Sequence, residues 1–171
     1  FHVLDLGKQL GLTPDIVLGL FFPSALIGGG ISVLVGWLSD RFRLKYFAAL
    51  MASGIGLSSF SLLTRIDGLL IPMLVAGLSI ANGCFVPISG AFAARYFGIK
   101  HIGAISGVFM STMIVGSSVG PLLFSLVRDF TGSYIPAFGG TFTVSICFVV
   151  ASFWANNPQR KMKAEMEKGV D

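Results

Sequence analysis

The sequence predicts an all-α integral membrane protein that crosses the bilayer five times. Hydrophobic residues fill 54% of the 171 positions, charged residues only 12%, and the mean hydropathy is positive. A soluble domain of this size carries more charge, so lipid has to cover part of this apolar surface. Five apolar stretches, each long enough to span a bilayer and each followed by a short polar connection, give the number of spans.

The first span is expected at residues 15–38, after a segment, residues 1–14, that is too short and too polar to cross. Thr13 can cap this helix, Pro14 suits its first position, and Asp15 complements the positive end of the helix dipole. No charge follows until the span ends. Pro23 predicts a kink within it.

Small residues recur at every fourth position of this first span. Such spacing puts them on one face, where a neighbouring helix can approach closely. The residues are Ser24, Gly28, Ser32 and Gly36.

Four further spans and a charged tail complete the predicted chain. The spans are expected at residues 46–63, 69–93, 102–127 and 134–155, and the tail at 156–171. The third span has a mildly polar face that includes Asn82. The fourth carries glycines that predict close helix packing, namely Gly103, Gly107, Gly116 and Gly120.

A cluster of four charges within six residues separates the first two spans. Asp40, Arg41, Arg43 and Lys45 follow Gly36 closely, and in so apolar a chain they mark where the backbone leaves lipid. Lys and Arg number nine in the connections at 40–45 and 95–100 and in the tail, against three in the alternate connections. The positive-inside rule therefore predicts that these three segments, including the C-terminus, are cytoplasmic.

Other classes of function find little support in the sequence. Cys84 and Cys147 lie in apolar runs, where a packing role is expected, so we predict neither a metal site nor a cofactor. Basic residues are not interleaved with exposed aromatics, which argues against nucleic-acid binding. His2 and His101 fall on opposite sides of the predicted membrane, and catalytic motifs are lacking, so we expect no enzyme.

The pattern G-x-L-S-D-R at residues 36–41 resembles the loop signature of the major facilitator superfamily of transporters. By this resemblance the five spans correspond to the eighth to twelfth helices, the C-terminal half of a twelve-helix fold. Residues 1–14 correspond to the end of the seventh helix and its outer loop. Residues 94–98, 101–107 and 120–124 resemble, more weakly, the oxalate/formate and monocarboxylate carriers.

The resemblance implies a secondary transporter that moves a small solute by alternating access, with an organic anion such as a monocarboxylate as the candidate. It also implies an N-terminal half of the same carrier, a coupling ion, and a multi-pass location in the plasma (inner) membrane. The first and fourth spans carry no interior charge that would bind an anion. A non-transporting membrane scaffold or a truncated remnant remains the alternative, because small-residue faces serve assembly equally well.

The resemblance also suggests site residues. We expect Asp40 near the start of the fourth span, at 101–104, where a helix N-terminus stabilises a carboxylate, with Arg41 or Arg43 beside it. Such a contact would close the cytoplasmic side and release during alternation; a merely solvated loop is the alternative. Cavity candidates on the first, third and fourth spans, which could instead serve helix packing, are Ser24, Asn82, Met110, Met113 and Ser117. His2 is a candidate for a proton path.

Overall fold

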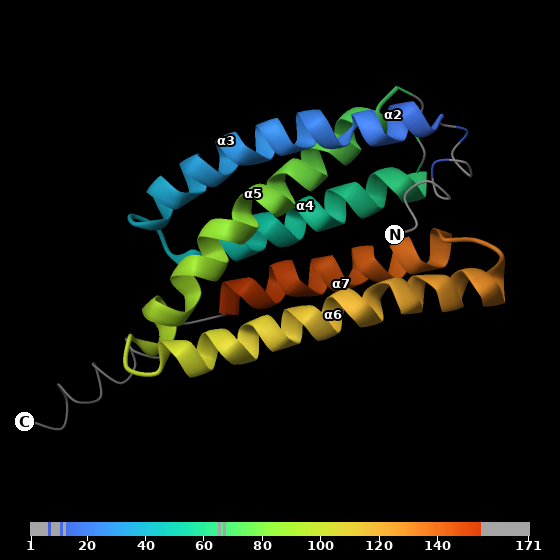
Figure 1. Cartoon of the computed structure of the whole chain (residues 1–171). Helices are drawn as coiled ribbons and strands as arrows, with labels where there is room; N and C mark the ends of the chain where they lie inside the picture. Colours follow the sequence, from blue (N-terminus) through green and yellow to red (C-terminus); the bar gives the residue numbers. More distant parts are fainter. Residues whose placement is uncertain (1–6, 8–10, 12, 65, 67, 155–171) are drawn as a thin grey trace, which may run out of the picture.

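The computed structural model describes residues 7, 11, 13–64, 66 and 68–154, and within them every regular element is a helix (Figure 1). The helices are α2 (Pro14–Gly19), α3 (Phe21–Ser39), α4 (Leu44–Thr64), α5 (Leu70–Phe97), α6 (Ile102–Thr131) and α7 (Ile135–Trp154). Five helical segments in this part of the chain are long and apolar enough to cross a membrane, with α2 and α3 together forming one. The all-α membrane class is confirmed.

The first span is interrupted at Leu20, close to the predicted kink at Pro23. Proline has no N–H, so the carbonyl of Gly19 lacks its usual partner four residues on. The amides on either side keep helical bonds: Leu20 donates to Ile16 O at 3.2 Å, and Ser24 donates to Leu20 O at 3.3 Å. The interruption is therefore local, and α2 and α3 continue in nearly the same direction (Figure 1).

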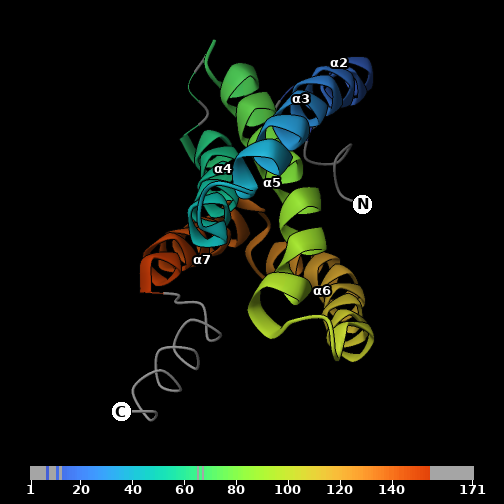
Figure 2. The same ribbon diagram turned by 90° about the vertical axis from the view of Figure 1, so that its left-hand side faces the viewer.

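Helix α5 lies at the centre of the bundle. It packs along both α3 and α4, and α4 in turn packs along α7. Helix α6 differs, because it has few contacts with α5 and α7 and none of its residues is buried. Viewed from the end, α5 lies between α3 and α6, and α6 stands apart from the other helices (Figure 2).

Glycines make the two crossings of α5 possible. A Cβ on Gly77 would lie 2.7 Å from the carbonyl oxygen of Gly54 on α4, and one on Gly83 would lie 2.7 Å from that of Gly28 on α3. The buried hydroxyl of Ser79 adds a hydrogen bond of 3.2 Å to the carbonyl of Ser24. Close backbone approach and interhelical hydrogen bonds are the usual basis of helix association in lipid.

Helix α5 ends at Gly98, whose φ of 78° is readily adopted only by a residue without a side chain. The amide of Gly98 donates to the carbonyl of Ala94 and closes the last turn. This turn carries Arg95, the one basic residue at that end of the helix. Its position brings Arg95 to the end of α3.

Candidate functional site

The connection between α3 and α4 is held to the end of α5 by Arg95. Nη2 of Arg95 lies 2.5 Å from Oδ1 of Asp40. Nη1 of the same guanidinium donates to the carbonyl of Ser39, which is buried and whose own hydroxyl donates to the carbonyl of Gly36. Arg95 thus places a positive charge on the negative end of α3 and on the first residue after it, the arrangement favoured by the helix dipole.

This partner differs from the predicted one. Asp40 was expected at the start of α6, at residues 101–104, but its ion-pair partner is Arg95, on the last turn of α5. The full charge of a guanidinium attracts a carboxylate more strongly than the partial charge of a helix N-terminus, and here one of its donors, Nη2, meets Asp40. Arg41 or Arg43 was expected beside Asp40; the guanidinium of Arg41 lies over the ring of Trp37, 4.4 Å from the ring centroid, and Arg43 is exposed.

The ion pair orients the loop more than it stabilises the fold. The Asp40 side chain is 76% exposed and that of Arg95 33%. Pairs with this exposure contribute about 0 to 1 kcal/mol, because water screens them and two long side chains lose freedom. What the pair does is fix the direction in which the chain leaves α3.

Lys45 ties the other end of the loop to α7. Its Nζ donates to the carbonyl of Phe153 at 3.0 Å, at the C-terminal end of α7, and lies 5.6 Å from the ring centroid of Tyr46. The predicted loop residues therefore divide between two neighbours, α5 and α7. Arg43 is exposed, and a Cβ on Gly36 would meet no atom within 4 Å.

The five predicted cavity residues do not converge in this bundle. Ser24 is buried in the crossing of α3 and α5, so its surroundings are those of a packing residue. Asn82 is exposed on α5. Met110, Met113 and Ser117 are exposed on α6, where the Ser117 hydroxyl donates within its own helix, to the carbonyl of Ile114.

The predicted packing residues also separate into two groups. Gly28 lies in the close crossing with α5, and Ser32 is half-buried. The four glycines of α6 have open space where a Cβ would stand; they are Gly103, Gly107, Gly116 and Gly120. Gly54, Gly77 and Gly83 lie in close contacts that were not predicted, although small residues four apart, such as Gly77 and Ala81, are the signal for such a contact.

Several predictions concern residues that the structure does not describe. These are the proton-path role of His2, the assignment of most of segment 1–14, and the tail at 156–171. Among the described residues, no group of three or more His, Cys, Asp or Glu side chains could hold a metal ion.

Sequence similarity to known proteins identifies the family of this chain. The sequence model of the Major Facilitator Superfamily matches residues 2–170. An uncharacterized MFS-type transporter from Methanocaldococcus jannaschii is 26% identical over 133 residues, which cover 76% of this chain and 34% of that relative. The match thus spans about a third of the relative's length. No solved structure matches the chain significantly. Since the family model covers almost every residue, this chain belongs to the Major Facilitator Superfamily.

Proposed function

We propose that this chain forms the C-terminal half of a secondary transporter that moves a small solute across a membrane by alternating access. The observation that carries the proposal is the charged loop after the first of five spans, with Asp40 held by Arg95. The family match over residues 2–170 supports the transporter class. By this proposal the matching N-terminal half lies elsewhere in the same carrier.

The contacts of the loop suit the rigid-body motion of one half. Asp40 and Arg95 both belong to the same bundle, so their pair does not join this half to another. Instead the pair, together with the bond from Lys45 to α7, ties the ends of α3, α5 and α7 to one loop. Alternating access in such carriers is largely rocking of one bundle against the other. A bundle with tied ends rocks as one body and carries the loop with it.

The proposed location is the plasma (inner) membrane, with the loop and the C-terminus in the cytoplasm. Among the described residues, the connections and helix ends on the side of Asp40 carry Arg41, Arg43, Lys45, Arg95 and Lys100. Among the described residues, the opposite side carries one basic residue, Arg128. This bias follows the positive-inside rule.

The solute is proposed to be small, with an organic anion such as a monocarboxylate as the first class to test. Within the described spans the cations lie at helix ends, as Lys45, Arg95 and Arg128 do. The positive charge that would bind an anion in mid-membrane, and any site for a coupling ion, is therefore proposed to come from the other half. Asn82, exposed near the middle of α5, is a polar group that this half offers to the solute.

The experiment is solute uptake by the full-length gene product in sealed proteoliposomes. The panel contains monocarboxylates, dicarboxylates and neutral solutes of similar size. Saturable uptake of one class supports the proposal. A non-transporting scaffold is the competing function, since the glycine crossings of α5 would serve assembly equally well. Uptake indistinguishable from that of protein-free liposomes across the panel, by a folded protein, favours the scaffold.

A further inference from the structure

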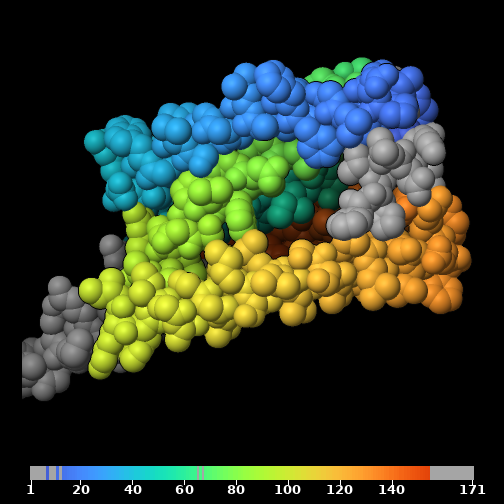
Figure 3. Space-filling model, in the orientation of Figure 1, coloured from blue at the N-terminus to red at the C-terminus, as the bar shows by residue number. Residues whose placement is uncertain are grey.

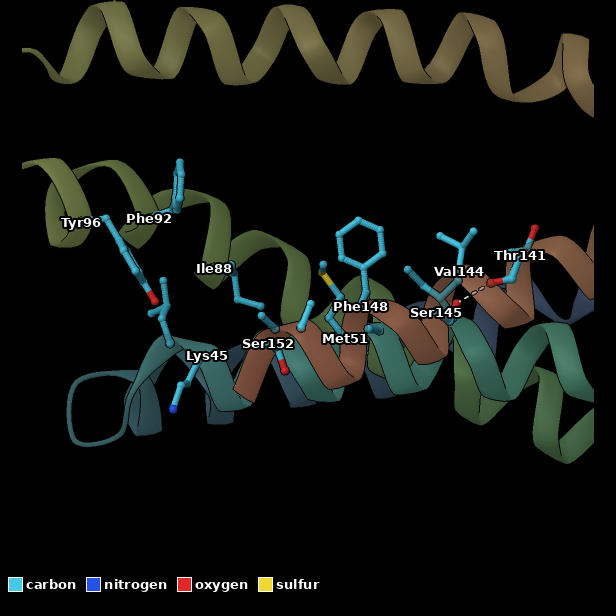
Figure 4. A pocket seen from close by; sticks show the side chains of 15 residues that line it. Lys45, Met51, Ile88, Phe92, Tyr96, Thr141, Val144, Ser145, Phe148 and Ser152 are labelled. Carbon is cyan, nitrogen blue, oxygen red and sulfur yellow. Dashed lines mark hydrogen bonds between the residues drawn. The ribbon is translucent and has the colours of Figure 1, made fainter. Parts of the chain in front are cut away.

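The main cleft of the bundle directs no charged side chain inward from the described residues that line it. A long hollow separates α6 from the other helices (Figure 3), and its enclosed part, of about 560 Å³, is lined mostly by apolar side chains of α4, α5 and α7. Lys45 borders the cleft, but its amine points away from it and donates to the carbonyl of Phe153 (Figure 4). The exposed charge at this end of the bundle lies instead on the loop between α3 and α4.

Two guanidinium groups of this loop are free to bind an anion. Arg41 and Arg43 are exposed, and neither has an ion pair or a hydrogen bond from its side chain to a described residue. The carboxylate of the loop, that of Asp40, is already paired with Arg95. The loop therefore offers positive charge that no carboxylate of the described chain neutralises.

Exposed aromatic rings accompany these cations. The guanidinium of Arg41 lies over the ring of Trp37, 4.4 Å from its centroid, and Trp37 is itself 58% exposed. A guanidinium has five N–H donors, so contact with a ring leaves donors for an anion. Phe42 and Tyr46 are exposed on the same loop and at the start of α4. The surface thus combines spare hydrogen-bond donors with apolar area.

The position of Trp37 places this surface at the boundary of the membrane. Trp37 lies in the last turns of α3, at the end of the first apolar span. Tryptophan and tyrosine are enriched at the level of the lipid headgroups, and basic side chains at span ends reach the phosphates. Lys100, in the connection between α5 and α6, is also exposed, but no described aromatic ring lies over its amine.

We propose that Arg41, Arg43 and Trp37 form a binding site for the headgroup of an anionic phospholipid. The lipid phosphate accepts hydrogen bonds from the two guanidinium groups, while the indole lies beside the glycerol and the first part of the acyl chains. A phospholipid suits the site better than a free anion, because the exposed rings of Trp37 and Phe42 need an apolar neighbour. With the topology proposed above, the lipid belongs to the cytoplasmic leaflet, where basic segments next to a membrane attract anionic lipids.

The test measures lipid binding to the full-length protein in mild detergent by native mass spectrometry. Phosphatidylglycerol is compared with phosphatidylcholine, which has the same phosphate but no net charge. The variants are Arg41→Gln, Arg43→Gln and the two combined. Lys100→Gln is the matched control, because it removes one exposed charge from the same side of the bundle.

The unaltered protein should bind the first phosphatidylglycerol molecule several-fold more tightly than phosphatidylcholine. Arg41→Gln should weaken this binding about fivefold, the contribution of one basic residue near a membrane surface. The double variant should weaken it further, and Lys100→Gln should leave it unchanged. Equal binding of the two lipids by the unaltered protein would overturn the inference. So would equal weakening by Arg41→Gln and Lys100→Gln, because overall charge would then account for the attraction.

A soluble competitor separates a lipid site from a site for a free anion. Glycerophosphoglycerol is the headgroup of phosphatidylglycerol without acyl chains, and at equal concentration it should not displace the lipid. Trp37→Leu should weaken the binding of phosphatidylglycerol, because the indole contact is lost. Displacement by glycerophosphoglycerol, with full lipid binding by Trp37→Leu, would show a site for a soluble phosphodiester and overturn the inference.

This readout is independent of transport. Selective binding of phosphatidylglycerol that depends on Arg41, in a carrier that moves no solute, would support the lipid site while the proposed function failed. Active transport by a carrier that binds both lipids equally would refute the lipid site alone.

Discussion

Arg95 and Asp40 lie 55 positions apart in the sequence, and their side chains meet at the ends of α5 and α3 at a distance of 2.5 Å. The same guanidinium holds the carbonyl of Ser39. One side chain therefore fixes both the last turn of α3 and the first residue of the charged loop.

Replacement of Asp40 by Asn should lower the free energy of unfolding by no more than about 1 kcal/mol, because the carboxylate is 76% exposed. Arg95→Gln should cost more than Asp40→Asn, since it also removes the bond to Ser39. The double variant should be no less stable than Arg95→Gln alone. Denaturation of all four proteins in mild detergent measures these values; strictly additive effects would show that the pair is not coupled.

Gly83→Ala should destabilise the bundle by about 1 to 3 kcal/mol, because the new methyl group would lie 2.7 Å from the carbonyl of Gly28 and force α3 away from α5. Gly90→Ala is the matched control on the same helix, where a Cβ meets no atom within 4 Å. It should be neutral or should stabilise the helix by up to about 1 kcal/mol. Thermal unfolding of both variants makes the comparison, and equal stability would contradict the close crossing.

Lys45→Met should loosen the last turn of α7, because the carbonyl of Phe153 loses its charged donor. The cost is about 1 kcal/mol of local opening energy for an exposed bond of this kind. Hydrogen exchange at the C-terminal end of α7 measures the effect. Arg43→Met, which removes one exposed charge from the same loop, is the control and should leave this exchange unchanged.

The spans themselves could be predicted from the sequence, because an apolar run long enough to cross a bilayer has few alternatives to a helix. The residues at which the spans end were harder to predict. The third span was expected to stop at residue 93, whereas α5 continues to Phe97. Arg95 marked a loop in the sequence, but a long side chain at a helix end reaches polar partners while its backbone stays helical. The pairing with Asp40 follows from that extra turn.

Contacts between helices could be predicted only in part. The spacing of small residues indicated a packing face on α3, and Gly28 lies in a crossing. The same spacing occurs on α6, but a Cβ added at Gly116 or Gly120 would meet no atom within 4 Å, so no helix of the described chain packs against these residues. A small-residue face shows that a helix can approach, but the choice of partner depends on the arrangement of all the other helices. For the same reason the sequence indicated the start of α6 and not Arg95 as the partner of Asp40.

The predicted topology can be tested by cysteine labelling in cells that express the full-length protein. Phe42 and Ile66 are both exposed and lie in successive connections, before α4 and after it. In a background without Cys84 and Cys147, a membrane-impermeant maleimide should label Ile66→Cys in intact cells and Phe42→Cys only after the membrane is opened. The reverse pattern would place the loop and the C-terminus outside.

We propose that the carrier works by alternating access and that Asp40 takes part in it. The most direct measurement is solute exchange in proteoliposomes, in which unlabelled solute inside should accelerate entry of labelled solute, because the loaded carrier then reorients in both directions. Such acceleration is expected for the full-length protein, together with a reorientation rate reduced by about two- to fivefold in Asp40→Asn, in line with an energy of up to about 1 kcal/mol. Asp129→Asn, an exposed carboxylate at the far end of α6, should match the unaltered protein. Solute entry that is unaffected by solute inside, or equal exchange by Asp40→Asn and Asp129→Asn, would contradict the claim.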